Sequence, residues 1–140
     1  MMIKMNSRII IVSGYLASGK STFAVRLSKV LNIPYFIKDT FKIALCSNIA
    51  INPTEESSRF SVVTFDAMMY AAERLLEVGL PVIIEGNFAP ADIKKVDEAG
   101  VIRVLTEKYG CQPLTYLFKG DSEFCTSVLW NVKKRPNAGA

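Results

Sequence analysis

The chain has 140 residues, of which 50% are hydrophobic and 21% charged, and its formal net charge is +4. These values exclude a disordered chain and predict one folded domain over residues 1–140, which needs no disulfide or structural metal. The sequence has no histidine and only three, widely spaced cysteines. This excludes histidine-based triads and most zinc sites, and is typical of a reduced, intracellular protein.

The N-terminal residues lead directly into the first predicted strand. Residues 1–7 contain one lysine, and the apolar run that follows is too short for a secretory signal. No run of apolar residues approaches the length that spans a bilayer. We therefore expect a cytoplasmic protein without a membrane-spanning segment.

A phosphate-binding motif lies between the first predicted strand and helix. The segment 8–13 contains the apolar, β-branched run Ile9 to Val12, as in a strand buried in a parallel sheet. Apolar residues at helical spacing follow from Phe23 to Leu31. Between them, Gly14 to Ser21 matches the pattern GxxxxGK(S/T). Glycines let consecutive N–H groups turn inward, and the helix adds the positive end of its dipole. The segment therefore predicts an anion-binding loop.

The residues of this loop predict a nucleoside triphosphate bound with Mg²⁺. Lys20 would reach the β- and γ-phosphates, and the Ser21 hydroxyl would bind the metal ion. A glycine-rich turn that fits the pattern by chance is the alternative, which the flanking strand and helix disfavour. The expected phosphate-binding residues are Gly14, Ala17, Ser18, Gly19, Lys20, Ser21 and Thr22.

The rest of the chain alternates predicted strands and helices. Strands are predicted at 34–39, 80–85 and 114–118. Helices are predicted at 41–49, from a cap and acidic first turn at 54–57 to a stop at Gly79, over 89–109 with an interruption near Gly100, and from Asp121 to about Lys134. The residues at helical spacing in the long helix are Phe60, Val63, Ala67, Ala71 and Leu75, and Phe65, Met68, Met69 and Tyr70 are also expected in the core. The alternation predicts an α/β fold with a parallel sheet covered on both faces.

Acidic residues end two predicted strands that should adjoin the phosphate loop. Asp39 ends the second strand, while Glu85 ends the third and is followed by Asn87. In parallel sheets the functional surface lies beyond the carboxyl ends of the strands, where a carboxylate can hold a metal-bound water or accept a proton from a hydroxyl. Asp39 is also a plausible helix cap, whereas a carboxylate after a buried strand favours a functional role for Glu85.

The sequence resembles the small P-loop kinases related to shikimate kinase, chloramphenicol phosphotransferase and zeta toxins, often described as AAA-type ATP-binding proteins. The resemblance rests on Gly14 to Thr22 and on residues 37–39, 82–88 and 117–121. It implies a P-loop three-layer sandwich with strands in the order 2-3-1-4-5, and ATP and Mg²⁺ as cofactors. It further implies contact between Asp39 and the acceptor hydroxyl, and a metal-binding role for Glu85, where many relatives carry aspartate.

The resemblance stops after the predicted fourth strand and the helix that follows it. Relatives continue through an arginine-bearing lid, a fifth strand and a last helix, whereas this sequence ends at Ala140. We therefore expect the order 2-3-1-4 without a fifth strand, self-association through the open edge of the fourth strand, and low or absent activity. Arg135 is the candidate lid arginine, with a solvated helix end as its alternative. A natural short form, a truncated product and a site completed by a partner stay open.

The expected function is a Mg²⁺- and ATP-dependent kinase that phosphorylates a hydroxyl group of a small molecule. Lys20, Asp39 and Arg135 are its expected catalytic residues, and Ser21 and Glu85 its expected metal ligands. The alternatives are a nucleotide-binding module or slow NTPase without a small acceptor, and a polynucleotide kinase. Lysines and arginines are spread over several segments instead of forming a basic stripe, which disfavours nucleic acid as the ligand. No motif identifies the acceptor or the base.

Overall fold

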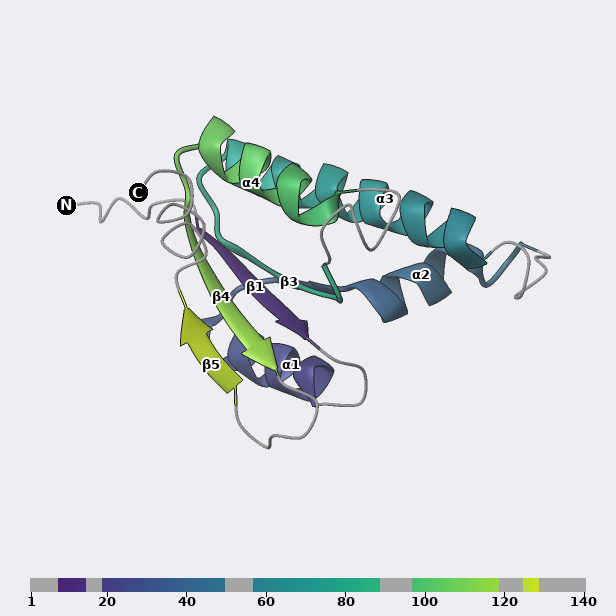
Figure 1. Ribbon diagram of the computed structural model, residues 1–140, viewed down its shortest axis with the longest axis horizontal. Helices are drawn as coiled ribbons and strands as arrows, with labels where there is room; N and C mark the ends of the chain where they lie inside the picture. Colours follow the sequence, from purple (N-terminus) through teal and green to yellow (C-terminus); the bar gives the residue numbers. More distant parts are fainter. Residues whose placement is uncertain (1–7, 15–18, 50–56, 89–96, 119–124, 129–140) are drawn as a thin grey trace.

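The computed structural model describes residues 8–14, 19–49, 57–88, 97–118 and 125–128 (Figure 1). Helices α3 and α4 lie over one face of a central sheet, and α1 lies against the other. The elements in chain order are β1 (Arg8–Gly14), α1 (Lys20–Leu31), β2 (Tyr35–Ile37), α2 (Lys38–Cys46), α3 (Ser57–Glu77), β3 (Val82–Glu85), α4 (Glu98–Lys108), β4 (Gln112–Phe118) and β5 (Cys125–Val128).

The sheet has the strand order β2-β3-β1-β4-β5, and its first four strands are parallel. The central strand β1 pairs with β3 on one side and with β4 on the other, so that Ile10 stands between Ile83 and Leu114. This arrangement confirms the predicted α/β three-layer sandwich and the predicted order 2-3-1-4. Every carboxyl end of the parallel strands therefore lies at one edge of the sheet.

A fifth strand corrects the predicted C-terminal half. β5 pairs antiparallel with β4, from Thr115 opposite Val128 to Phe118 opposite Cys125. The helix predicted from Asp121 is therefore wrong over 125–128, and so is the expectation of a sheet that ends at its fourth strand. The physical reason is the open edge of β4, whose backbone groups gain hydrogen-bond partners from the short segment with β-branched residues. The resemblance implies a parallel fifth strand, which this one is not.

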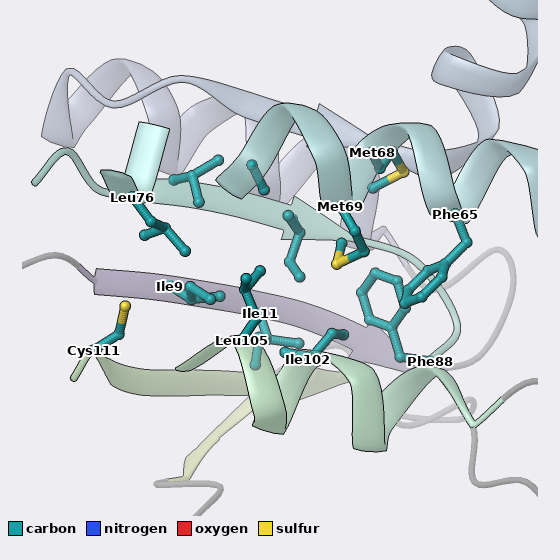
Figure 2. Close-up of a cluster of buried hydrophobic side chains, with 13 residues drawn as sticks. Ile9, Ile11, Phe65, Met68, Met69, Leu76, Phe88, Ile102, Leu105 and Cys111 are labelled. Atoms are coloured by element: carbon teal, nitrogen blue, oxygen red, sulfur yellow. The ribbon is translucent and has the colours of Figure 1, made fainter. Parts of the chain in front are cut away.

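Alternate residues of β1 face two separate parts of the core. Ile9 and Ile11 join the cluster under α3 and α4, whereas Ile10 and Val12 join the cluster under α1. Figure 2 shows side chains from α3 and α4 converging on Ile9 and Ile11. Burial on both faces explains why this strand is uniformly apolar instead of alternating.

The face that α3 turns toward the sheet confirms the predicted core residues Phe65, Met68 and Met69 but not Tyr70, which is 65% exposed. Its buried hydrophobic residues are Phe65, Met68, Met69, Ala72 and Leu76. Val63, expected in the core, is instead 53% exposed. Apolar residues occur on more than one side of this helix, so their spacing does not select a face, and contact with the sheet does.

Helices α2 and α4 begin at positions that the sequence patterns did not predict. α2 begins at Lys38, so Asp39 lies in its first turn instead of ending a strand.

α4 begins at Glu98, after the capping residue Asp97, and continues through Gly100 without interruption. The Asp97 carboxylate accepts a hydrogen bond from Gly100 N–H at 3.0 Å, and a Cβ at residue 100 would lie 2.3 Å from Asp97 Oδ2. Gly100 therefore makes room for the helix cap; residues 89–96 lie outside the described part of the chain.

Gly14 lies at the end of β1, opposite Phe118 of β4. Its φ angle is 136°, and a Cβ there would lie 2.1 Å from the carbonyl oxygen of Phe118. Only glycine fits this contact, since both the backbone conformation and the space exclude a side chain. The first glycine of the phosphate motif thus also shapes the sheet.

None of the helices described is both long and apolar enough to cross a membrane.

Candidate functional site

The candidate site lies at the carboxyl edge of the three strands β1, β2 and β3. In the sheet register Glu85 stands between Val12 of β1 and Ile37 of β2. The residues at the ends of those two strands therefore flank Glu85: Ser13 and Gly14 follow Val12 on one side, and Lys38 and Asp39 follow Ile37 on the other.

Hydrogen bonds hold the chain after β3 against the end of β1. Gly86 N–H donates to the carbonyl oxygen of Val12 at 3.0 Å, and Phe88 N–H donates to the Ser13 hydroxyl at 3.2 Å. A Cβ at residue 86 would lie 2.9 Å from the Phe88 ring and 3.3 Å from the Lys38 Cβ. Glycine thus lets the loop after Glu85 pass close to α2.

Lys20 and Glu85 form a buried ion pair. Lys20 Nζ lies 3.3 Å from Glu85 Oε2, and the two side chains are 7% and 3% exposed. Gly19, with a φ angle of 87°, precedes Lys20 in a left-handed conformation that suits glycine. The lysine of the phosphate motif therefore already faces the carboxylate that ends β3.

Burial raises the pKa of the Glu85 carboxyl above its usual range, because desolvation penalises the charged form. The Lys20 ammonium acts in the opposite direction through its charge and a hydrogen bond, and the negative charge of Asp39 raises the pKa further. Asp39 is therefore close enough to Glu85 to affect its charge. Lys20 and Asp39 thus act on the pKa of the Glu85 carboxyl in opposite directions.

A cavity of about 140 Å³ opens among these groups. It is smaller than the roughly 300–1,000 Å³ of common ligand pockets, so it suits the reacting groups of a ligand better than a whole nucleotide. The structure brings Lys20, Asp39 and Glu85 together here. The lining residues are Lys20, Lys38, Asp39, Lys42, Ser61, Glu85, Gly86 and Asn87.

The other predicted site residues are placed only in part. Ser21 and Thr22 lie in the first turn of α1 with exposed side chains, and Gly14 ends β1. Ala17, Ser18 and Arg135 lie outside the described residues. The chemical roles assigned to all of these residues stay predictions.

Four cavity or near-cavity residues were missed by the sequence interpretation. Lys38, Lys42 and Ser61 line the cavity. Lys38 Nζ forms an ion pair with Glu98 Oε2 at 2.8 Å, and the two side chains are 9% and 2% exposed. Lys38 directly precedes Asp39, which was a usable signal. Glu98 is 60 residues away along the chain, and no local pattern marks it.

The donor atoms at the site fit a magnesium ion that is held together with phosphates. Among the residues described, no three His, Cys, Asp or Glu side chains form a ready metal site. Magnesium in phosphate chemistry needs only one or two protein oxygens, since phosphates and waters complete its shell. Glu85 lies 3.3 Å from Lys20 at the cavity, and Ser21 follows Lys20 in sequence. The metal-binding roles of Ser21 and Glu85 stay predictions.

A parallel sheet of order 2-3-1-4, with Lys20 opening the helix after the central strand, defines the P-loop class of nucleotide-binding folds. Within this class the chain has the fold of the P-loop kinases, as its structural neighbours show. No protein-family model matches the sequence, and no curated protein matches it either.

The similar solved structures share the fold at low sequence identity. A candidate kinase from Chloroflexus aurantiacus has a TM-score of 0.72 and 24% identity, over 81% of this chain and 60% of that one. The chain thus spans 60% of the length of that relative. The APS kinase CysC of Mycobacterium tuberculosis has a TM-score of 0.53 and 13% identity, over 81% of this chain and 76% of that one. APE1195 has a TM-score of 0.57 and 21% identity, over 96% of this chain and 72% of that one.

Proposed function

We propose that the protein is a Mg²⁺- and ATP-dependent kinase that phosphorylates a hydroxyl group of a small molecule. The observation that carries the proposal is the single cavity in which Lys20, Asp39 and Glu85 meet at the carboxyl edge of the sheet. A phosphate-binding cation, a metal-binding carboxylate and a second carboxylate are the parts that phosphoryl transfer requires. The kinase fold of the structural neighbours supports the same reading.

Lys20 is the residue that would change partners when nucleotide binds. It faces the Glu85 carboxylate at 3.3 Å. Nucleotide phosphates carry more negative charge than one carboxylate, and Lys20 would turn to them as a point charge. Ser21 and Glu85 would hold Mg²⁺, which neutralises charge on the phosphates when it is bound.

Asp39 is the proposed acceptor-side base. Its side chain is exposed, lines the cavity and lies in the first turn of α2, where an acidic group interacts favourably with the helix dipole. The carboxylate would orient the acceptor hydroxyl and take its proton as the phosphoryl group is transferred. Arg135 would add a positive charge to the transferring phosphoryl group in a lid.

Nucleotide-dependent thermal stabilisation and turnover test the proposal together. Mg²⁺-ATP should raise the melting temperature of the wild type and of Lys29→Ala, a control on the exposed end of α1, but not that of Lys20→Ala. Asp39→Asn should bind ATP within about threefold of the wild type while transfer to hydroxyl compounds falls at least about 100-fold.

Two results would contradict these assignments. Equal stabilisation of the wild type and Lys20→Ala would remove Lys20 from the nucleotide site. A parallel loss of ATP affinity and turnover in Asp39→Asn would make Asp39 structural or metal-linked, and ATP hydrolysis unaffected by any hydroxyl compound would favour a simple NTPase.

A further inference from the structure

Helix α2 places two lysines on the wall of the cavity. Lys38 and Lys42 are four residues apart, so they share one face of the helix, and both line the cavity with Asp39. Like charges at this spacing repel each other and weaken a helix. Lys38 is also the first residue of α2, where the helix dipole disfavours a cation and favours an anion. The helix alone does not explain this arrangement.

Glu98 holds Lys38 from outside the cavity. The distance from Lys38 Nζ to Glu98 Oε2 is 2.8 Å, and Glu98 is not among the lining residues. An ammonium group has three N–H donors, of which this hydrogen bond uses one. Lys38 Nζ also lies 5.8 Å from the centre of the Phe65 ring, which restricts the side chain further. These two contacts fix the ammonium group at the wall of the cavity.

Stability does not account for such a pair. Charges that leave water lose hydration, and apolar residues of similar size serve a protein core equally well or better. Lys38 and Glu98 are nevertheless both buried. A ligand that meets the lysine at the cavity wall gives the pair a function.

We propose that Lys38 and Lys42 bind an anionic group of the acceptor, such as a carboxylate, phosphate or sulfate, and that Glu98 is the positioning residue for Lys38. The acceptor would then carry this group beside the hydroxyl that faces Asp39. That the bound anionic group belongs to the acceptor rests on the proposed function. The anion site itself rests on the two lysines and Glu98.

Binding of inorganic phosphate tests the proposal without knowledge of the acceptor. The protein is saturated with Mg²⁺ and a non-hydrolysable ATP analogue, so that the phosphate loop is filled, and phosphate is titrated calorimetrically. We expect the wild type to bind phosphate and Lys38→Met/Glu98→Met to bind it at least about tenfold more weakly, with unchanged affinity for the analogue. The double variant replaces the whole pair, which leaves no buried charge unpaired.

Matched variants separate the proposed site from other effects. Lys108→Met is the control, because Lys108 Nζ also lies 2.8 Å from a carboxylate, that of Glu73, but does not line the cavity; it should bind phosphate as the wild type does. Lys42→Gln leaves the buried pair intact and should weaken phosphate binding several-fold. This variant keeps the test decisive if the double variant does not fold.

Each result has a defined meaning. The proposal is overturned if the wild type binds no phosphate, or if the cavity variants bind it as tightly as the wild type. It is also overturned if the variants lose affinity for the nucleotide analogue in the same proportion, since the lysines would then serve the nucleotide. Failure of the wild type to bind the analogue contradicts the proposed function instead, and phosphate titration of Lys20→Ala then still tests the lysines of α2.

Discussion

Burial and the neighbouring Lys20 ammonium have opposite effects on the pKa of the Glu85 carboxyl. Glu85 is 3% exposed, and its burial raises the pKa although Lys20 Nζ lies 3.3 Å away and lowers it. A carboxylate kept in such surroundings reduces the stability of the folded chain at neutral pH. This loss is understandable at a site where a cation and phosphates are to be bound.

The raised pKa of Glu85 predicts a pH dependence of stability. The folded chain binds more protons than the unfolded chain between the ordinary value of 4.5 and the raised pKa. The contribution of Glu85 to the free energy of unfolding should therefore fall as the pH rises through this window and stay low above it. Denaturant unfolding from pH 4 upward measures the free energy of unfolding of the wild type and of Glu85→Gln. The wild-type value minus the variant value should decrease as the pH rises.

The control for this measurement is Glu107→Gln, which changes an exposed glutamate of α4. Its difference from the wild type should not reproduce the decrease. A wild-type minus Glu85→Gln difference that is flat, or that grows with pH, would contradict the assigned effect of burial.

Some of these residue-scale features were readable in the sequence. Lys20 belongs to a motif of consecutive residues, and Glu85 follows a continuous apolar run, so both were identified and lie together. The partnership of Lys38 and Glu98 depends instead on the packing of the start of α2 near the start of α4. A lysine and a glutamate 60 residues apart carry no local sign of contact.

At the scale of elements, the close approach of β1 and β4 depends on a glycine. Gly14 pairs with Phe118 at the ends of the two strands. Gly14→Ala would bring a Cβ to within 2.1 Å of the Phe118 carbonyl oxygen, at a φ angle of 136°. We expect a loss of about 3 kcal/mol or more in the free energy of unfolding, since backbone strain and overlap add. Denaturant unfolding measures it.

Gly110→Ala distinguishes overlap from strain alone. Gly110 also has a positive φ angle, 61°, but nothing lies within 4 Å of the position of its Cβ. The expected loss there is about 1 kcal/mol, from the left-handed conformation only. If both variants lose the same free energy of unfolding, the overlap at Gly14 is relieved by a movement of β1 away from β4 that does not destabilise the fold.

The central strands and α3 were easier to predict from the sequence than the short strand β5. The strands at the centre of the sheet are apolar on both sides and were recognised. The long helix α3 was recognised too, and so were its core residues Phe65, Met68 and Met69. Val63 and Tyr70 were also expected in the core but are exposed, because apolar residues occur on more than one side of this helix. The short strand β5 was read as helix, because its pairing with β4 is a contact between segments and its residues carry no strong local signal.

At the scale of the whole molecule, β5 changes the expected surface for self-association. The edge of β4 is paired with β5 from Thr115 to Phe118, so this stretch no longer offers free backbone groups on that side. The outermost strand there is β5, while the three-residue strand β2 ends the sheet on the other side. Very short edge strands are poor templates for pairing.

We therefore propose that self-association, if backbone pairing drives it, uses the edge at β5. Light scattering at several concentrations should show a mass that increases with concentration in the wild type. Thr126→Lys, which places a charge on this edge strand, should reduce the increase, whereas Tyr35→Lys on β2 should not. A concentration-independent monomer mass would remove self-association from the account of this chain.

The sequence by itself determined the features that depend on neighbouring residues. The phosphate motif and the apolar central strands follow from local spacing, and the parallel sheet follows from the rules of strand and helix connection. The order of the four parallel strands was implied by the resemblance to small P-loop kinases. Tertiary structure alone decided the buried pair of Lys38 and Glu98, the exposure of Val63 and Tyr70 on α3, and the pairing of β5 with β4. These features are contacts between distant segments, and their free energy depends on surfaces that exist only once the sheet has formed.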